Sequence, residues 1–131
     1  MIAPTQSLSW AEQLLATPEA ATPVGRRAIA VLVRQALESA IRRYWETREP
    51  DMVRASGRAK FVALRMRSDP AVAAEAHQVW AALSDATHHH PYELTPPLES
   101  VAHWTARTRA LVAAIEAEGS GGAAGAATTR A

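Results

Sequence analysis

The sequence predicts an all-α protein, an antiparallel bundle of four main helices plus a short N-terminal helix. Hydrophobic residues make up 48% of the 131 residues, and alanine dominates them while β-branched residues are few, which favours helices over strands. Apolar residues recur at helical spacing in several stretches, and prolines, glycines and capping residues separate these stretches. Together these observations indicate a helical bundle with one core.

The first two helices are expected at residues 10–16 and 23–47. Ser9 followed by Glu12 has the form of a capping box. Thr22 and Pro23 supply a cap and a first-turn proline for the second helix. The apolar positions of that helix share one broad face: Ile29, Leu32, Val33, Ala36, Leu37, Ala40, Ile41, Tyr44 and Trp45.

The third and fourth helices follow a proline break. The third is predicted to begin near Met52 or after Ser56 and to end near residue 67. Asp69 as cap and Pro70 in the first turn begin the fourth helix, which is expected over 70–89.

The fifth helix is expected over 97–118, with Gly119 closing it. Residues 1–118 are therefore predicted to form a single helical domain. Residues 119–131 are predicted to be a flexible Gly/Ala-rich tail, because this composition cannot bury enough apolar surface to order itself. The four tryptophans, which are interpreted as core anchors, are Trp10, Trp45, Trp80 and Trp104.

The composition excludes several classes of protein. The chain contains no cysteine, which rules out disulfides, thiolate nucleophiles and cysteine zinc sites. It lacks a long apolar run, a signal-peptide pattern, a Gly-rich phosphate loop and a nucleophile elbow. We therefore expect a cytoplasmic protein without a membrane span and without a cofactor.

Charge is unevenly spread along the chain. Residues 26–67 carry eleven basic and four acidic side chains, a net charge of +7, whereas residues 68–131 carry a net charge of −4. Arg27, Arg34 and Arg42 lie opposite the apolar face of the second helix, and Glu38 can pair with Arg34 and Arg42 at helical spacing. These three arginines are candidate nucleic-acid ligands, although a solvated helix face or attraction between two helical hairpins is the simpler explanation of them.

The end of the predicted fourth helix carries the most distinctive polar cluster. Asp85 and His89 are four residues apart, as are Ser84 and His88, so each pair can meet on the helix surface. An aspartate beside a histidine fixes its tautomer, as a general base requires. Asp85, His88 and His89 are therefore the candidate catalytic residues.

Two other interpretations of this cluster stay open. Histidines in a last helical turn can simply cap free carbonyl groups and suit the helix dipole. Metal binding would require His77, His103 or Glu93 to converge on the cluster, because three consecutive histidines point in different directions, and no metal site is predicted.

The long helix around residues 31–38 and the polar helix end at 84–90 resemble the HEPN superfamily, small helical bundles of toxin–antitoxin, defence and RNA-processing systems. The resemblance covers residues 22–118. Ribonucleases of that family carry an arginine about four to six residues before a histidine. Here no arginine occupies that window before any of the five histidines, and Ser84 and Asp85 precede His88 instead. The resemblance implies a homodimer with its two His-rich helix ends close together, and binding of RNA, a nucleotide or a partner protein.

Three functions remain in view. The first is a non-enzymatic helical interaction domain that dimerises or binds a protein or nucleic-acid partner through the Arg-rich second and third helices. The alternative is a HEPN-like ribonuclease or other toxin that uses His88 or His89 with Asp85, and Arg34 or Arg42 from a neighbouring helix. The third is a structural subunit that its tail tethers to a larger assembly.

Overall fold

The computed structural model describes residues 2–88 and 94–129, with side chains up to residue 119. Helices cover most of this part of the chain. Its elements, in order, are α1 (Pro4–Leu15), a 3₁₀ turn η1 (Pro18–Ala21), α2 (Pro23–Arg48), a 3₁₀ turn η2 (Pro50–Arg54), α3 (Gly57–Leu64), α4 (Pro70–Thr87) and α5 (Leu98–Thr129).

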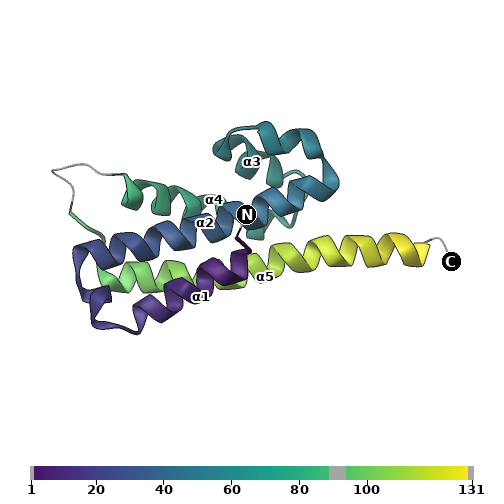
Figure 1. The fold of residues 1–131 in the computed structure, drawn as a ribbon. Coiled ribbons are helices and arrows are strands. Elements are labelled where there is room, and N and C mark those ends of the chain that lie inside the picture. Colours follow the sequence, from purple (N-terminus) through teal and green to yellow (C-terminus); the bar gives the residue numbers. More distant parts are fainter. Residues whose placement is uncertain (1, 89–93, 130–131) are drawn as a thin grey trace.

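The longest fully described helix, α2, lies at the centre and contacts α1, α4 and α5 (Figure 1). Along the series α1, α2, α4 and α5 each helix runs antiparallel to the one before it, so α2 and α5 run in the same direction. The contacts between the two helices follow the same order along both, as expected for a parallel pair. Arg26 donates to the Pro96 carbonyl, Arg43 pairs with Glu116, and Arg48 donates to the Glu118 carbonyl. The all-α bundle predicted from the sequence is confirmed.

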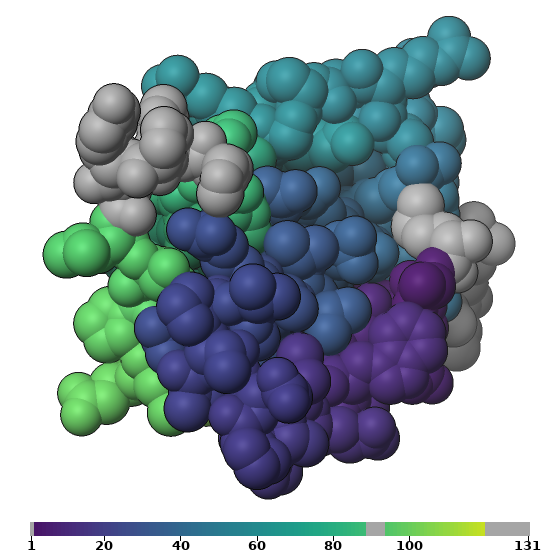
Figure 2. Space-filling view, turned by 60° about the vertical axis from the view of Figure 1, so that its left-hand side comes forward, coloured from purple at the N-terminus to yellow at the C-terminus, as the bar shows by residue number. Residues whose placement is uncertain are grey.

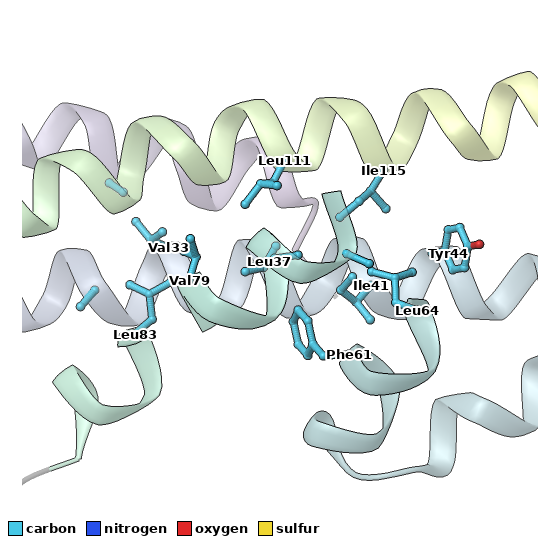
Figure 3. Close-up of a cluster of buried hydrophobic side chains, with 14 of the residues drawn as sticks. Val33, Leu37, Ile41, Tyr44, Phe61, Leu64, Val79, Leu83, Leu111 and Ile115 are labelled. Carbon is cyan, nitrogen blue, oxygen red and sulfur yellow. The ribbon is translucent and has the colours of Figure 1, made fainter. Parts of the chain in front are cut away.

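The core fills the space between α2, α3, α4 and α5 (Figure 3). Leu37 of α2, Leu64 of α3 and Leu83 of α4 are each 0% exposed. Trp45 is also fully buried, and its indole N–H donates to the Lys60 carbonyl at 3.2 Å. This bond, together with Phe61 in the core, holds the short helix α3 against α2.

The capping signals at α2 and α4 act as predicted. The Thr22 hydroxyl accepts from the Gly25 amide at 3.0 Å, and the Asp69 carboxylate accepts from the amides of Ala71 and Val72 at 2.8 and 3.3 Å. Because these signals are local in sequence, they predicted the starts of both helices correctly. Helix α4 ends at Thr87 rather than at residue 89, and His88 already has an extended backbone.

The expected start of the first helix was wrong. Helix α1 begins at Pro4, five residues before the supposed cap at Ser9, and the proline occupies the first turn. The Glu12 side chain does not close a capping box, because Arg109 of α5 binds both of its oxygens at 2.7 Å. The N-terminal helix is therefore a full member of the bundle, and the short helix is α3, which Ser56 caps.

Helix α5 also differs from expectation, because it continues past Gly119 to Thr129. None of the described glycines has a positive φ, so Gly119 does not adopt the left-handed backbone that ends many helices. No proline follows it, and alanine is the strongest helix former. Within the part of the chain that the structure describes, no helix combines the length and apolar character needed to cross a membrane.

Candidate functional site

The C-terminal end of α4 brings together several residues that the sequence singled out. Arg27 of α2 lines a small pocket with Asp85 and His88 of the α4 end, closed by the segment from Leu94 to Pro96. The pocket has a volume of about 20 Å³, which is room for about one water molecule. His89 lies outside the described residues. Two of the three candidate catalytic residues, Asp85 and His88, thus line the same pocket as Arg27, one of the candidate nucleic-acid ligands.

Arg34 reaches the same end of α4 from the next turns of α2. Its Nη1 donates to the Thr87 hydroxyl at 2.6 Å, and Thr87 in turn donates to the Ser84 carbonyl at 3.1 Å. Its Nε lies 3.1 Å from a Glu38 carboxylate oxygen, an ion pair without the alignment of a hydrogen bond. Sequence reasoning missed Thr87 as the partner, because only the packing of α2 against α4 brings the two side chains together.

Arg42 does not join this group. It lies eight residues beyond Arg34, which is about 12 Å along a helix. It pairs with Glu46 at 3.0 Å instead of with Glu38, as had been expected. It lines a separate hollow of about 320 Å³ between α1, α2 and α3, together with Ser39 and Lys60. The three candidate nucleic-acid ligands therefore do not form one surface.

His77, which shares a helical stripe with Ser84 and His88 in the sequence, belongs to a different site. Its ring stacks near Phe61 of α3 at 6.3 Å and lies 6.2 Å from the Trp80 ring. Burial lowers the pKa of His77 from 6.5, and the positive charges of Arg65 and Arg58 lower it further. The neutral form of the His77 imidazole is therefore favoured. Arg58 and Arg65 lie close enough to this α4 side chain for their charges to affect it.

Most of the described arginines have partners within the bundle. Two bidentate pairs bind α5 to its neighbours: Arg107 to Glu75 of α4 at 2.6 Å for both bonds, and Arg109 to Glu12 of α1. The hydrogen bond from the arginine holds the pKa of each glutamate below its ordinary value of 4.5. Of the described basic residues that form no ion pair, four belong to η2, α3 and the residue after α3: Arg54, Arg58, Lys60 and Arg65.

We call residues 50–67 the basic segment. The side chains of Arg54, Arg58 and Arg65 are exposed, and Lys60 is half-buried. Arg58 and Arg65 are seven residues apart, which places them on the same side of α3. Val62 and Met66 lie beside them and are 47% and 87% exposed. The only acidic residue of the segment is Asp51. The segment therefore presents a protruding, positively charged surface.

Comparisons with known proteins give no relative. No family model matches the chain, and neither a curated protein nor a solved structure shows significant similarity to it. The described residues contain no group of three or more histidine, aspartate or glutamate side chains placed to hold a metal ion. The surfaces and pockets of this chain are therefore what indicates its function.

Proposed function

We propose that this protein is a non-enzymatic helical domain that binds single-stranded RNA through the basic segment. One observation carries the proposal: Arg54, Arg58, Lys60 and Arg65 form no ion pair among the described residues, whereas most arginines elsewhere in the bundle do. Unpaired cations on one protruding element suit the phosphate backbone of a nucleic acid. The resemblance of residues 22–118 to the HEPN superfamily implies RNA, a nucleotide or a partner protein as the ligand, and RNA is the one that the basic segment favours.

The composition of the segment favours RNA over a protein partner. The core of a protein–protein interface is poor in charged residues, whereas surfaces that bind nucleic acid are markedly positive. Arginine planes also stack on the unpaired bases of single strands. The experiment must distinguish RNA from an acidic protein partner.

The test is the salt dependence of binding to a fluorescently labelled, mixed-sequence RNA strand, measured by anisotropy. Each phosphate contact on a single strand adds about 0.7 to the slope of log affinity against log salt. We expect R58Q/R65Q to lower that slope by about 1.4. The matched control R42Q/R43Q removes the same amount of charge from α2. Arg42 already pairs with Glu46, and Arg43 with Glu116, so this variant should keep the wild-type slope.

Two results would overturn the proposal. One is the absence of salt-sensitive RNA binding by the wild-type protein, which would move the search to acidic protein partners. The other is an equal slope for R58Q/R65Q and the wild type, which would place the phosphate contacts elsewhere.

A second candidate function, RNA cleavage at the α4 end, has one observation in its favour. Arg27, Asp85 and His88 line the same small pocket, so an arginine, a carboxylate and an imidazole are grouped at this end of α4. An imidazole can move a proton while an arginine holds a phosphate group. The RNA from the binding experiment, separated on a denaturing gel, tests this role. RNA that stays intact with the wild-type protein would exclude this role in cleavage. Cleavage by His88→Ala at the wild-type rate would exclude a role of His88.

A further inference from the structure

A histidine of α4, His77, lies against the basic segment, which runs along the top of the molecule in Figure 2. The ring of Phe61, in the middle of α3, stacks on the Trp80 ring with 4.9 Å between their centroids, and the His77 ring is 6.3 Å from Phe61. A Cβ at Gly57 would lie 3.0 Å from the Trp80 ring, so the start of α3 also packs closely on α4. These contacts hold α3 on the part of α4 that carries His77.

Two exposed arginines flank His77. Arg58 lies in the first turn of α3, and Arg65 follows its last turn, still with helical backbone angles. Arg58, Phe61 and Arg65 are three and four residues apart, so they share one stripe along the helix. Because Phe61 at the centre of this stripe faces His77, one arginine lies towards each side of the imidazole. The charges of both arginines lower the pKa of His77, which agrees with this placement.

The carboxylates on the neighbouring helices are engaged elsewhere. From α2, Glu38 approaches the cluster and accepts from the Trp80 indole N–H at 3.4 Å. Towards α5, Glu75 is bound by Arg107, and its position two residues from His77 places it on roughly the opposite side of α4. Among the described residues, His77 forms no ion pair with a carboxylate. An anion that neutralises this cluster of three basic groups would have to come from a ligand.

We propose that the imidazolium form of His77 joins Arg58 and Arg65 in binding an RNA phosphate, so that RNA binding takes up a proton from solvent. This inference rests on the proposed function, because it needs a phosphate group at the basic segment. A phosphate between the two arginines offsets the repulsion that keeps His77 neutral, and its oxygens can accept from the imidazole N–H groups.

The coupling between proton and RNA must act in both directions. A ligand that favours the protonated histidine binds more tightly at a pH where that histidine is protonated. The RNA affinity is therefore expected to rise as the pH falls through the range in which His77 titrates. Arginine and lysine stay charged throughout this range, so they contribute no such pH dependence.

The experiment is anisotropy with the labelled mixed-sequence RNA at pH 8 and pH 5.5, at constant ionic strength. We expect the wild-type protein to bind about tenfold more tightly at pH 5.5, the gain from one further charge-assisted contact with phosphate. His77→Gln should bind as the wild type does at pH 8 and gain little at pH 5.5. The matched control is His103→Gln, at an exposed position of α5 beside Glu75, which should keep the full pH dependence.

Proton NMR of the wild-type protein gives a second measurement, which does not depend on how well a variant folds. The ring signal of His77 is assigned by its absence from the spectrum of His77→Gln. Titration with and without RNA should give a higher pKa for His77 in the complex, because bound phosphate favours the imidazolium. The pKa of His103 should change less.

The outcomes separate this inference from the proposed function. If RNA binds at neither pH, the proposed function is wrong, and this inference is wrong with it. If RNA binds equally tightly at both pH values, or if His77→Gln gains as much affinity at pH 5.5 as the wild type, only this inference is wrong. A pKa of His77 that RNA leaves unchanged would also overturn it.

Discussion

Position 25, in the first turn of α2, requires glycine because there is no room for a side chain, and not because of its backbone conformation. Its φ is not positive, but a Cβ at this position would overlap the Glu19 carbonyl oxygen and lie 2.9 Å from the Thr22 hydroxyl. The turn η1 would have to move away from α2. We expect Gly25→Ala to lower the free energy of unfolding by about 3 kcal/mol, measured by urea denaturation.

Gly119 supplies the matched control for this substitution. It is also helical, and a Cβ there would meet no atom within 4 Å. Gly119→Ala should therefore raise the stability by about 0.5 kcal/mol, the ordinary gain when alanine replaces glycine in a helix. If Gly25→Ala were as stable as Gly119→Ala, η1 would not pack against α2 as closely as the structure indicates.

At the scale of single residues, the sequence predicted what depends on near neighbours in the chain. Thr22 and Asp69 cap their helices with amides two or three residues away, and such spacing can be read directly. Gly25 could not be understood in this way, because its neighbour depends on the path of η1. Ser9 and Glu12 had the correct spacing for a capping box, but Arg109, 97 residues from Glu12, binds that glutamate instead.

Helix α5 is joined to α1 and α4 by ion pairs that give the bundle a testable response to acid. The pKa values of Glu12 and Glu75 lie below 4.5 in the folded chain, chiefly because Arg109 and Arg107 donate hydrogen bonds to them. A carboxyl group whose pKa is lower in the folded state stabilises the fold above its unfolded pKa. That stability is lost as the pH falls from about the unfolded value of 4.5 through the folded value.

We expect the melting temperature of E12Q/E75Q to fall less than that of the wild type between pH 7 and pH 3, as measured by calorimetry. The difference should be modest. The four side chains of the two ion pairs are 33–42% exposed, so water screens both pairs. The control E19Q/E99Q removes two exposed glutamates that form no ion pair in the described chain, and it should follow the wild-type curve. Parallel curves for the wild type and E12Q/E75Q would argue against a role of these pairs in joining the helices.

At the scale of helices, the predicted elements were correct but several of their ends and partners were not. The apolar stripe and both flanking signals defined α2 to within one residue at its C-terminal end. The continuation of α5 past Gly119 could not be foreseen from glycine alone, because glycine ends a helix only where the backbone turns left-handed. Interhelix pairs such as Glu75 with Arg107 depend on the rotation of each helix about its axis, which packing decides.

At the scale of the molecule, the fold class followed from composition and periodicity, whereas the grouping of the candidate site residues did not. Arg27 and Arg34 lie by the α4 end because α2 and α4 are antiparallel neighbours. Arg42, on the same helix, lies too far along it to take part. The charge excess of residues 26–67 indicated a basic surface. Ion pairs engage three of the six α2 arginines, whereas four of the five basic side chains of the basic segment form none among the described residues.

The domain boundary expected at residues 118–119 leads to a prediction for the whole molecule. Every buried residue of the described core lies at or before Ile115. The last described contacts of α5 with its neighbours are at Glu118, which accepts from the Ser68 hydroxyl at 2.6 Å and from the Asp69 amide at 2.9 Å. A chain that ends at Gly119 keeps all of these contacts. We expect its melting temperature to stay within about 2 °C of the full chain.

Glu118→Ala in that shortened chain is the informative comparison. It removes two hydrogen bonds to a carboxylate that tie α5 to the start of α4, and such bonds contribute about 1.5 kcal/mol or more. For a domain of this size the melting temperature should fall by about 5 °C. If instead the shortening itself produced a loss of that size, residues 120–131 would belong to the folded domain. Contacts of α5 that stabilise the fold would then extend beyond Glu118, into residues 119–131, which were predicted from the sequence to be a flexible tail.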